Sequence, residues 1–232
     1  MIDIPVDIVS INCVNPEESI KALDYSCNKI KFNNSYLLTD KKIQHGNHKL
    51  IYVDKIKSIS EYNNFCLKLN KFEFESDHIL LIQDDGYVIN AENWNNEFLK
   101  YDYIGAPWPN DQVWLEKFIE PSLQNFVSDI FNENRVGNGG FSLRSRKFLE
   151  YSENFTSCEG IGEDLFLTII NYNKALDNSI IFPDVEEALK FSTEFGLFGK
   201  DKKKWLKYKY MKKITSFGFH GKMNINEIKL KS

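Results

Sequence analysis

Paired cysteines are missing from this sequence. The 232 residues include four cysteines, Cys13, Cys27, Cys66 and Cys158, and no two of them form a C-x-x-C pair. Their wide spacing excludes a zinc ribbon or a dithiol redox motif. It favours reduced, mostly buried thiols, as expected for a cytosolic protein.

Long apolar runs and a leader-like start are also missing. No apolar stretch approaches the roughly 20 residues that a membrane-spanning helix requires. The first residues, Met1–Pro5, lack the basic region and the apolar segment of a signal peptide. The sequence therefore predicts a soluble protein without a transmembrane segment, located in the cytoplasm.

The chain has no excess of positive charge. Its 29 Lys and Arg residues against 33 Asp and Glu residues give a net charge of -4. A nucleic-acid partner is therefore not expected. The basic and aromatic segment Lys200–Lys213 has two interpretations. It could bind phosphate or an anionic acceptor, or it could be a solvated helix face.

The first hundred residues alternate between predicted strands and predicted helices. Predicted strands are Val6–Ile11, Tyr36–Asp40, Leu50–Val53 and a run from Ile79. Helices are predicted from Pro16 and over Ser60–Phe74, from the spacing of their apolar residues. This order predicts an α/β fold with crossover connections.

The second half is less regular. Helices are predicted over Asn93–Tyr101, from about Arg146, and over Asp184–Phe195, and a strand is predicted from Tyr103. We expect a single domain over residues 1–222, with a nucleotide-binding half of about 1–100, an acceptor half of about 101–222, and a C-terminal tail over 223–232.

Two adjacent acids end the most apolar strand. Ile79–Ile82 runs into Gln83, Asp84, Asp85 and Gly86. Carboxylates at the carboxyl edge of a sheet lie where open α/β folds bind ligands, and oxygen ligands suit a hard divalent cation. A simple Asp-Gly hairpin turn remains an alternative.

Three glycines in four residues, Gly137 to Gly140 around Asn138, form a second motif. The run lacks the Gly-Lys-Ser/Thr ending of a P-loop and the spacing of a dinucleotide fingerprint. It predicts either positive φ angles in a tight turn or a bare backbone surface that a ligand approaches closely.

Two further sites carry candidate chemistry. Glu163 and Asp164 follow a flexible Gly160–Gly162 lead-in, so they could be acids in the first turn of a helix or carboxylates of a catalytic loop that includes a general base. His220, between Gly218 and Gly221, could be a structural residue or a ligand for manganese or zinc.

Four blocks of sequence together resemble a known family. They are QDDGYV from Gln83, YDYIGAPW from Tyr101, VGNGGFSLRS from Val136, and Glu163-Asp164. The chain is identified from them as a member of the DUF5672 family, which resembles nucleotide-sugar glycosyltransferases of the GT-A fold. The resemblance extends from about Val6 to His220 and implies a Rossmann-like three-layer α/β/α fold with a mixed sheet.

The resemblance separates the two adjacent acids. In the family the strand end usually reads Gln-x-Asp-Gly, so Asp85 matches the family's acid and Asp84 occupies the variable position. This departs from the D-x-D spacing of most GT-A enzymes and leaves open whether one carboxylate or two hold the metal.

A more distant likeness to metal-dependent inverting β-galactosyltransferases implies individual roles. By that analogy Asp85 and His220 bind Mn2+ or Mg2+, Asp164 is the general base, and Glu163 orients the acceptor. An inverting outcome belongs to the same analogy, which rests on fold alone.

The implied substrates are a nucleotide-sugar donor, with a UDP-sugar favoured, and a hydroxyl acceptor on a glycan or glycoconjugate. Residues expected to contact the donor are Ser10, Asn12, Asp40, Gln83, Asp84, Gly139 and Gly140. Two rival functions stay open, a metal-dependent phosphoesterase or nucleotidyltransferase and a non-catalytic carbohydrate-binding protein. The sequence does not determine the oligomeric state.

Overall fold

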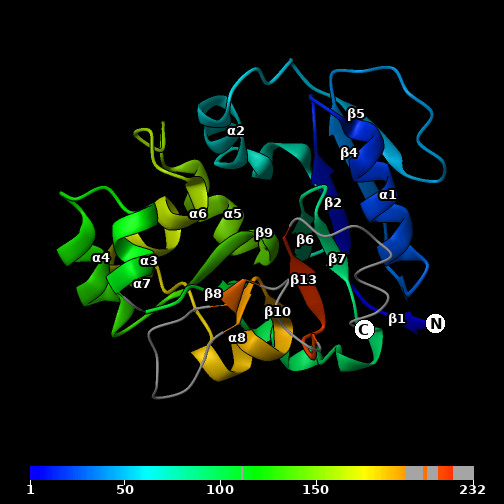
Figure 1. Cartoon of the computed structure of the whole chain (residues 1–232). Helices are drawn as coiled ribbons and strands as arrows, with labels where there is room; N and C mark the ends of the chain where they lie inside the picture. Colours follow the sequence, from blue (N-terminus) through cyan, green and yellow to red (C-terminus); the bar gives the residue numbers. More distant parts are fainter. Residues whose placement is uncertain (111, 197–205, 208–213, 222–232) are drawn as a thin grey trace.

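The computed structural model of the chain describes residues 1–110, 112–196, 206–207 and 214–221 (Figure 1). The α-helices are α1 Pro16–Cys27, α2 Ile59–Cys66, α3 Gln112–Phe118, α4 Gln124–Phe131, α5 Arg146–Glu153, α6 Glu163–Leu165, α7 Tyr172–Asp177 and α8 Val185–Phe191. The 3-10 helices are η1 Leu69–Phe72, η2 Ala91–Asn93 and η3 Asn96–Lys100, and a π-helical turn, η4, covers Phe166–Ile170.

The strands are β1 Ile2–Asp3, β2 Asp7–Ile11, β3 Ile30–Lys31, β4 Ser35–Thr39, β5 Lys49–Tyr52, β6 His78–Ile82, β7 Gly86–Val88, β8 Tyr103–Pro107, β9 Val136–Ser145, β10 Ser192–Thr193, β11 Phe195–Gly196, β12 Leu206–Lys207 and β13 Gly218–His220. In the described part of the chain, the main sheet has six strands in the order β5-β4-β2-β6-β9-β8. The first four are mutually parallel, and β9 runs antiparallel to both β6 and β8. The sheet is therefore mixed, as the sequence predicts.

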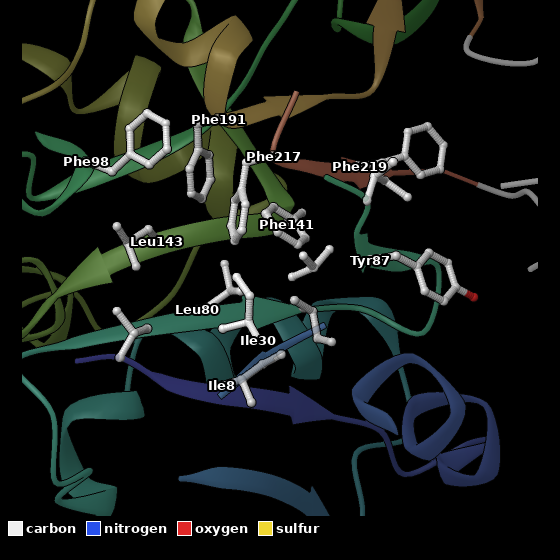
Figure 2. Packing of buried hydrophobic residues seen from close by; sticks show 14 of the residues in the cluster. Ile8, Ile30, Leu80, Tyr87, Phe98, Phe141, Leu143, Phe191, Phe217 and Phe219 are labelled. Atoms are coloured by element: carbon white, nitrogen blue, oxygen red, sulfur yellow. The ribbon is translucent and has the colours of Figure 1, made fainter. Parts of the chain in front are cut away.

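Alternate residues of the central strands enter different cores. In β6, Leu80 and Ile82 pack on the face covered by α1 and α8, whereas Ile79 and Leu81 pack on the face covered by α2 and α5. Burial on both faces explains why β6 is an uninterrupted apolar run. Figure 2 shows the first core, where Phe141 of β9 lies beside Phe191 and Phe217. The expected three-layer α/β/α arrangement is confirmed.

A second, small sheet brings a late segment to the end of β6. In the order β10-β13-β7, strand β13 pairs parallel with β10 and antiparallel with β7. The β13–β7 register places His220 opposite Gly86. A side chain 135 positions later in the sequence than Asp85 therefore lies next to the strand-end acids.

Several predicted elements differ from the observed ones. The glycines of residues 137–140 lie inside the fully buried strand β9 and not in a tight turn, and the described glycines with positive φ are Gly46, Gly160 and Gly221. The Ser60–Phe74 helix is divided, because α2 ends at Cys66 and η1 closes at Glu73 with a left-handed backbone. The Asn93–Tyr101 segment winds as 3-10 helix, and α8 stops at Phe191 because Ser192 and Thr193 pair with β13.

Of the helices within the described residues, none combines the length and apolarity that crossing a bilayer requires. The basic segment Lys200–Lys213 lies outside the described residues except for 206–207, and the 223–232 tail lies wholly outside them.

Candidate functional site

The two strand-end acids face different surroundings. After β6 the backbone turns tightly, with Gln83 N–H donating to the Gly140 carbonyl at 2.9 Å and Gly86 N–H donating to the Gln83 carbonyl at 3.0 Å. This turn directs Asp85 toward His220, whereas Asp84 lines a neighbouring pocket. Burial, and then the charge of Asp85, raise the pKa of Asp84.

His220 lies between carboxylates from two parts of the chain. Its Nε2 atom is 3.1 Å from Asp85 Oδ1 and 3.2 Å from Gln83 Oε1, and its Nδ1 atom is 3.7 Å from Glu194 Oε1. Burial alone would lower the pKa of His220, but the hydrogen bond that His220 donates to Asp85 and the charges of Glu194, Asp85 and Asp164 outweigh burial and raise that pKa.

The bare backbone of β9 provides the space for this imidazole. A Cβ atom on Gly140 would lie 2.1 Å from His220 Nε2, and one on Gly139 would lie 3.0 Å from Asp164 Cβ. Neither glycine has a positive φ. The glycines are therefore required by close approach of side chains. A ligand packed against this backbone, the second alternative that the sequence left open, stays a prediction.

Asp164 is fixed by backbone donors beside the same glycines. Its Oδ2 accepts the Gly139 N–H at 2.9 Å and its Oδ1 accepts the Leu165 N–H at 2.8 Å. The Thr168 hydroxyl donates to the Asp164 carbonyl from the π-helical turn η4, a feature often found at functional sites. Asp164 is half-buried, so part of its carboxylate remains accessible.

Glu163 points away from Asp164 into the protein interior. Its Oε1 forms a 2.7 Å ion pair with Arg144, and the side chains of Arg144 and Glu163 are 1% and 6% exposed. Burial alone would lower the pKa of Arg144. The negative charge of Glu163 outweighs burial and holds that pKa above its ordinary value. The structure thus places Glu163 as an internal anchor of the loop that carries Asp164, not at an open surface.

Glu194 belongs to the same cluster, and no motif in the sequence indicates it. It follows β10, whose parallel pairing with β13 sets it beside His220. Burial raises the pKa of Glu194 to about 7 against the opposing effect of His220. Glu194 has no motif around it, and only the pairing of β10 with β13 reveals its position.

A pocket of about 390 Å³ opens at the carboxyl ends of β2 and β6. It is lined by residues 11–14, residues 56–59, Tyr62, Gln83 and Asp84. Asn12, Gln83 and Asp84 thus lie together at this pocket, and their contact with a donor stays a prediction. Ser10 and Asp40 are not among the lining residues, because the Ser10 side chain is fully buried and Asp40 Oδ1 is also enclosed, and neither atom has a hydrogen-bond partner there.

The donor atoms at the strand end suit a small divalent ion. Two ligands in adjacent octahedral positions, each about 2.1 Å from such an ion, lie about 3 Å apart. The separation of Asp85 Oδ1 and His220 Nε2 fits this value, and Gln83 Oε1 supplies a third donor. Within the described residues, however, no three or more His, Cys, Asp and Glu side chains are grouped to hold a metal, because Glu194 faces the other ring nitrogen.

Comparison with protein families identifies the sequence. The model of a family described as "Protein of unknown function (DUF5672)" matches residues 47–220, three quarters of the chain. The chain belongs to the DUF5672 family. A search of curated proteins finds no match.

Solved structures with a similar arrangement include glycosyltransferases. Glucosyl-3-phosphoglycerate synthase from Mycobacterium tuberculosis, in complex with phosphoglyceric acid, aligns with a TM-score of 0.51 at 11% identity, over 80% of this chain and 75% of the synthase. The galactosyltransferase LgtC, in complex with donor and acceptor sugar analogues, aligns with a TM-score of 0.45 at 13% identity, over 80% and 69% of the two chains. By the alignment with the synthase, the fold of this DUF5672 protein is GT-A-like.

Proposed function

We propose that this DUF5672 protein transfers a sugar from a nucleotide-sugar donor to a hydroxyl acceptor. The observation that carries the proposal is the convergence of Asp85, His220 and Asp164 on the Gly139–Gly140 backbone, beside a pocket at the carboxyl edge of a GT-A-like sheet. Ligands of open α/β folds bind at this edge. The four groups come from separate elements, so a role in folding alone does not account for their meeting there.

Asp85 and His220 would hold the divalent ion, Mn2+ or Mg2+. Both ions are bound by few protein ligands when substrate phosphates complete their coordination, which fits a site with one carboxylate, one imidazole and the Gln83 amide. Bound there, the ion would neutralise the charge that develops on a nucleoside diphosphate leaving group.

Asp164 would act as the general base. Its two hydrogen bonds from backbone N–H groups orient the carboxylate, and the remaining lone pairs can accept the acceptor's hydroxyl proton. Glu163, paired with Arg144, would act as a positioning residue for this loop. With Asp164 on one side of the sugar and the leaving group on the other, inversion of the anomeric carbon follows.

The pocket would bind the nucleoside part of the donor, with a UDP-sugar favoured. Val14 and Ile59 at this pocket are 80% and 81% exposed, and a planar base placed against them would cover their apolar surface. Asn12, Lys57 and Asp84 offer polar atoms in the same pocket for the base, a phosphate and the ribose hydroxyls.

The roles of Glu163 and Asp164 can be separated by mutation. Asp164→Asn should lower metal-dependent hydrolysis or transfer of the donor by about 10²- to 10⁴-fold and leave donor binding intact. Glu163→Gln should instead lower the free energy of unfolding by about 3 kcal/mol, because it leaves Arg144 buried without a charged partner. Turnover retained by Asp164→Asn would remove Asp164 as the base.

The rival hydrolytic function gives a different result with the same protein. Release of phosphate from simple phosphoesters, without any response to nucleotide sugars, would favour a phosphoesterase function over glycosyl transfer.

A separate test concerns the metal site. Unchanged metal-dependent donor binding in Asp85→Asn would show that Asp85 is not a metal ligand.

A further inference from the structure

Glu194 faces His220 from the side opposite Asp85. The parallel pairing of Thr193 with Phe219 places the next residue of each segment side by side. Glu194 Oε1 then lies 3.7 Å from His220 Nδ1, while Asp85 Oδ1 lies 3.1 Å from Nε2. Each nitrogen of the imidazole ring is thus opposite its own carboxylate.

His220 Nδ1 needs an acceptor at this position. The atom is fully buried and is among the buried side-chain polar atoms that lack a hydrogen-bond partner in the described part of the chain. A closing movement of less than 1 Å would bring Glu194 Oε1 within hydrogen-bond distance of it. Buried polar groups are normally satisfied, and an exception such as this one calls for an explanation, of which a functional role is one.

The Glu194 carboxylate is itself held in place. Asn138 Nδ2 donates to Glu194 Oε2 at 2.6 Å, and Asn138 Oδ1 accepts the Gly140 N–H at 3.2 Å. The same Gly140 leaves the space that the His220 ring occupies. Asn138 therefore fastens the carboxylate to the same stretch of β9 against which the imidazole packs, and this gives the asparagine of the glycine-rich motif a role.

We infer that Glu194 is a positioning residue that accepts the Nδ1 proton of His220 and so directs the Nε2 lone pair at the cation bound by Asp85. The inference rests on the proposed metal site. A histidine that binds a metal through Nε2 carries its proton on Nδ1, and a carboxylate that accepts this proton fixes the ring and strengthens the ligand. Loss of such a partner typically weakens metal binding about 10- to 100-fold.

Glu194 could instead serve only to fasten β10 to β9. Glu194→Gln distinguishes the two roles, because an amide has one acceptor end and one donor end. It cannot accept from Asn138 Nδ2 and His220 Nδ1 together. Glu18→Gln is the matched control. It also removes one carboxylate near the strand-end acids, because the charge of Glu18 acts on Asp84, but Glu18 pairs with Lys21 on the surface and not with His220.

The first measurement is Mn2+ binding by the full-length protein, followed by titration calorimetry and electron paramagnetic resonance. Glu194→Gln should raise the Mn2+ dissociation constant about 10- to 100-fold, and Glu18→Gln should leave it within about twofold. Urea unfolding of each variant identifies the folded fraction. Wild-type Mn2+ affinity in folded Glu194→Gln would overturn the inference, whatever the variant's stability.

The second measurement is made without metal and separates this inference from the proposed function. Nitrogen-15 and proton spectra of histidine-labelled protein, with His220→Gln to assign the signal, should show a His220 Nδ1 signal that shifts in Glu194→Gln and not in Glu18→Gln. A His220 spectrum unchanged by Glu194→Gln would overturn the inference. If the spectrum shifts but the protein binds no Mn2+, Glu194 still orients His220, and the proposed metal site is contradicted instead.

Discussion

At the scale of single residues, the absence of one methyl group at position 140 permits the site to form. Gly140→Ala would place a Cβ 2.1 Å from His220 Nε2, so the ring must move away from Asp85. We expect this variant to lose Mn2+ binding and about 1–3 kcal/mol of unfolding free energy. Calorimetric Mn2+ titration and urea unfolding measure the two effects.

Gly137→Ala is the control for that substitution. It lies in the same strand, and its added Cβ would overlap Trp108 and Thr168 but not His220. A similar loss of stability with Mn2+ binding retained would confirm that the effect at position 140 is local. Mn2+ binding by Gly140→Ala at the wild-type affinity would contradict the described geometry.

The thiol of Cys27 gives a pH-dependent prediction. Burial raises the pKa of Cys27 to about 11, so the protonated, unreactive form persists in the folded protein well above pH 9. At pH 8 its thiolate fraction is about one in a thousand, against about one in four for a free cysteine. Alkylation of native Cys27 should therefore be about 250-fold slower than in the urea-unfolded chain.

Mass spectrometry of iodoacetamide-treated protein measures that rate at Cys27. Between pH 7 and 10 the native rate should rise about tenfold per pH unit, whereas the unfolded rate should level off above about pH 9. A native rate that levels off near pH 9 would show that the thiol is not held in its buried, protonated form.

The sequence predicted some functional residues and missed others for a physical reason. Asp85 is visible because it ends an apolar strand, and Asp164 because it opens a helix after glycines. Glu194 stands in no motif, and nothing in the VGNGGFSLRS block marks Arg144 as an ion-pair partner. Their partners are distant in the sequence, so only the folded chain reveals these contacts. For the same reason, the ion pair that draws Glu163 inward could not be foreseen.

At the scale of elements, β9 and the helix that follows it connect the sheet to the site. Ser145 ends β9 and caps α5, with its Oγ accepting the Phe148 N–H at 3.1 Å and donating to Asp102 Oδ1 at 2.7 Å. Ser145→Ala removes both bonds and leaves the buried Asp102 without one donor. It should lower the unfolding free energy by about 2 kcal/mol.

Ser58 offers the matched comparison, because it caps α2 through a single hydrogen bond to the Glu61 N–H in an exposed position. Ser58→Ala should cost about 1 kcal/mol in urea unfolding. Equal losses for the two variants would mean that the bond between Ser145 and Asp102 adds nothing to the cap.

Sequence patterns predicted elements well where the pattern was local and poorly where pairing decided the outcome. The strands β2, β4, β5 and β6 and the helix α1 are found close to their predicted positions. The short strands β10 and β13 are two and three residues long and owe their existence to each other and to β7. The β9 glycines look like a turn in the sequence. Pairing with β8 on one side and the hydrogen bond from the Gln83 N–H to the Gly140 carbonyl on the other keep this stretch extended.

At the scale of the whole molecule, the two sheets meet where the proposed chemistry occurs. The main sheet supplies Asp85 and the β9 glycines, the small sheet supplies His220 and the segment before Glu194, and α6 supplies Asp164. Residues separated by more than 130 positions converge there. A sequence reading can predict the layers of such a fold, but it cannot predict which late strand returns to the edge.

The measurement that tests the central claim most directly is a thermal-shift screen of UDP-, GDP-, CMP- and dTDP-sugars, with and without Mn2+, on the wild type and Asp85→Asn. At a concentration about 100 times its dissociation constant, one donor should raise the wild-type Tm by about 5–10 °C, and it should do so only when Mn2+ is present. Asp85→Asn should lose that shift. No shift with any donor, or the same shift in Asp85→Asn, would contradict the account.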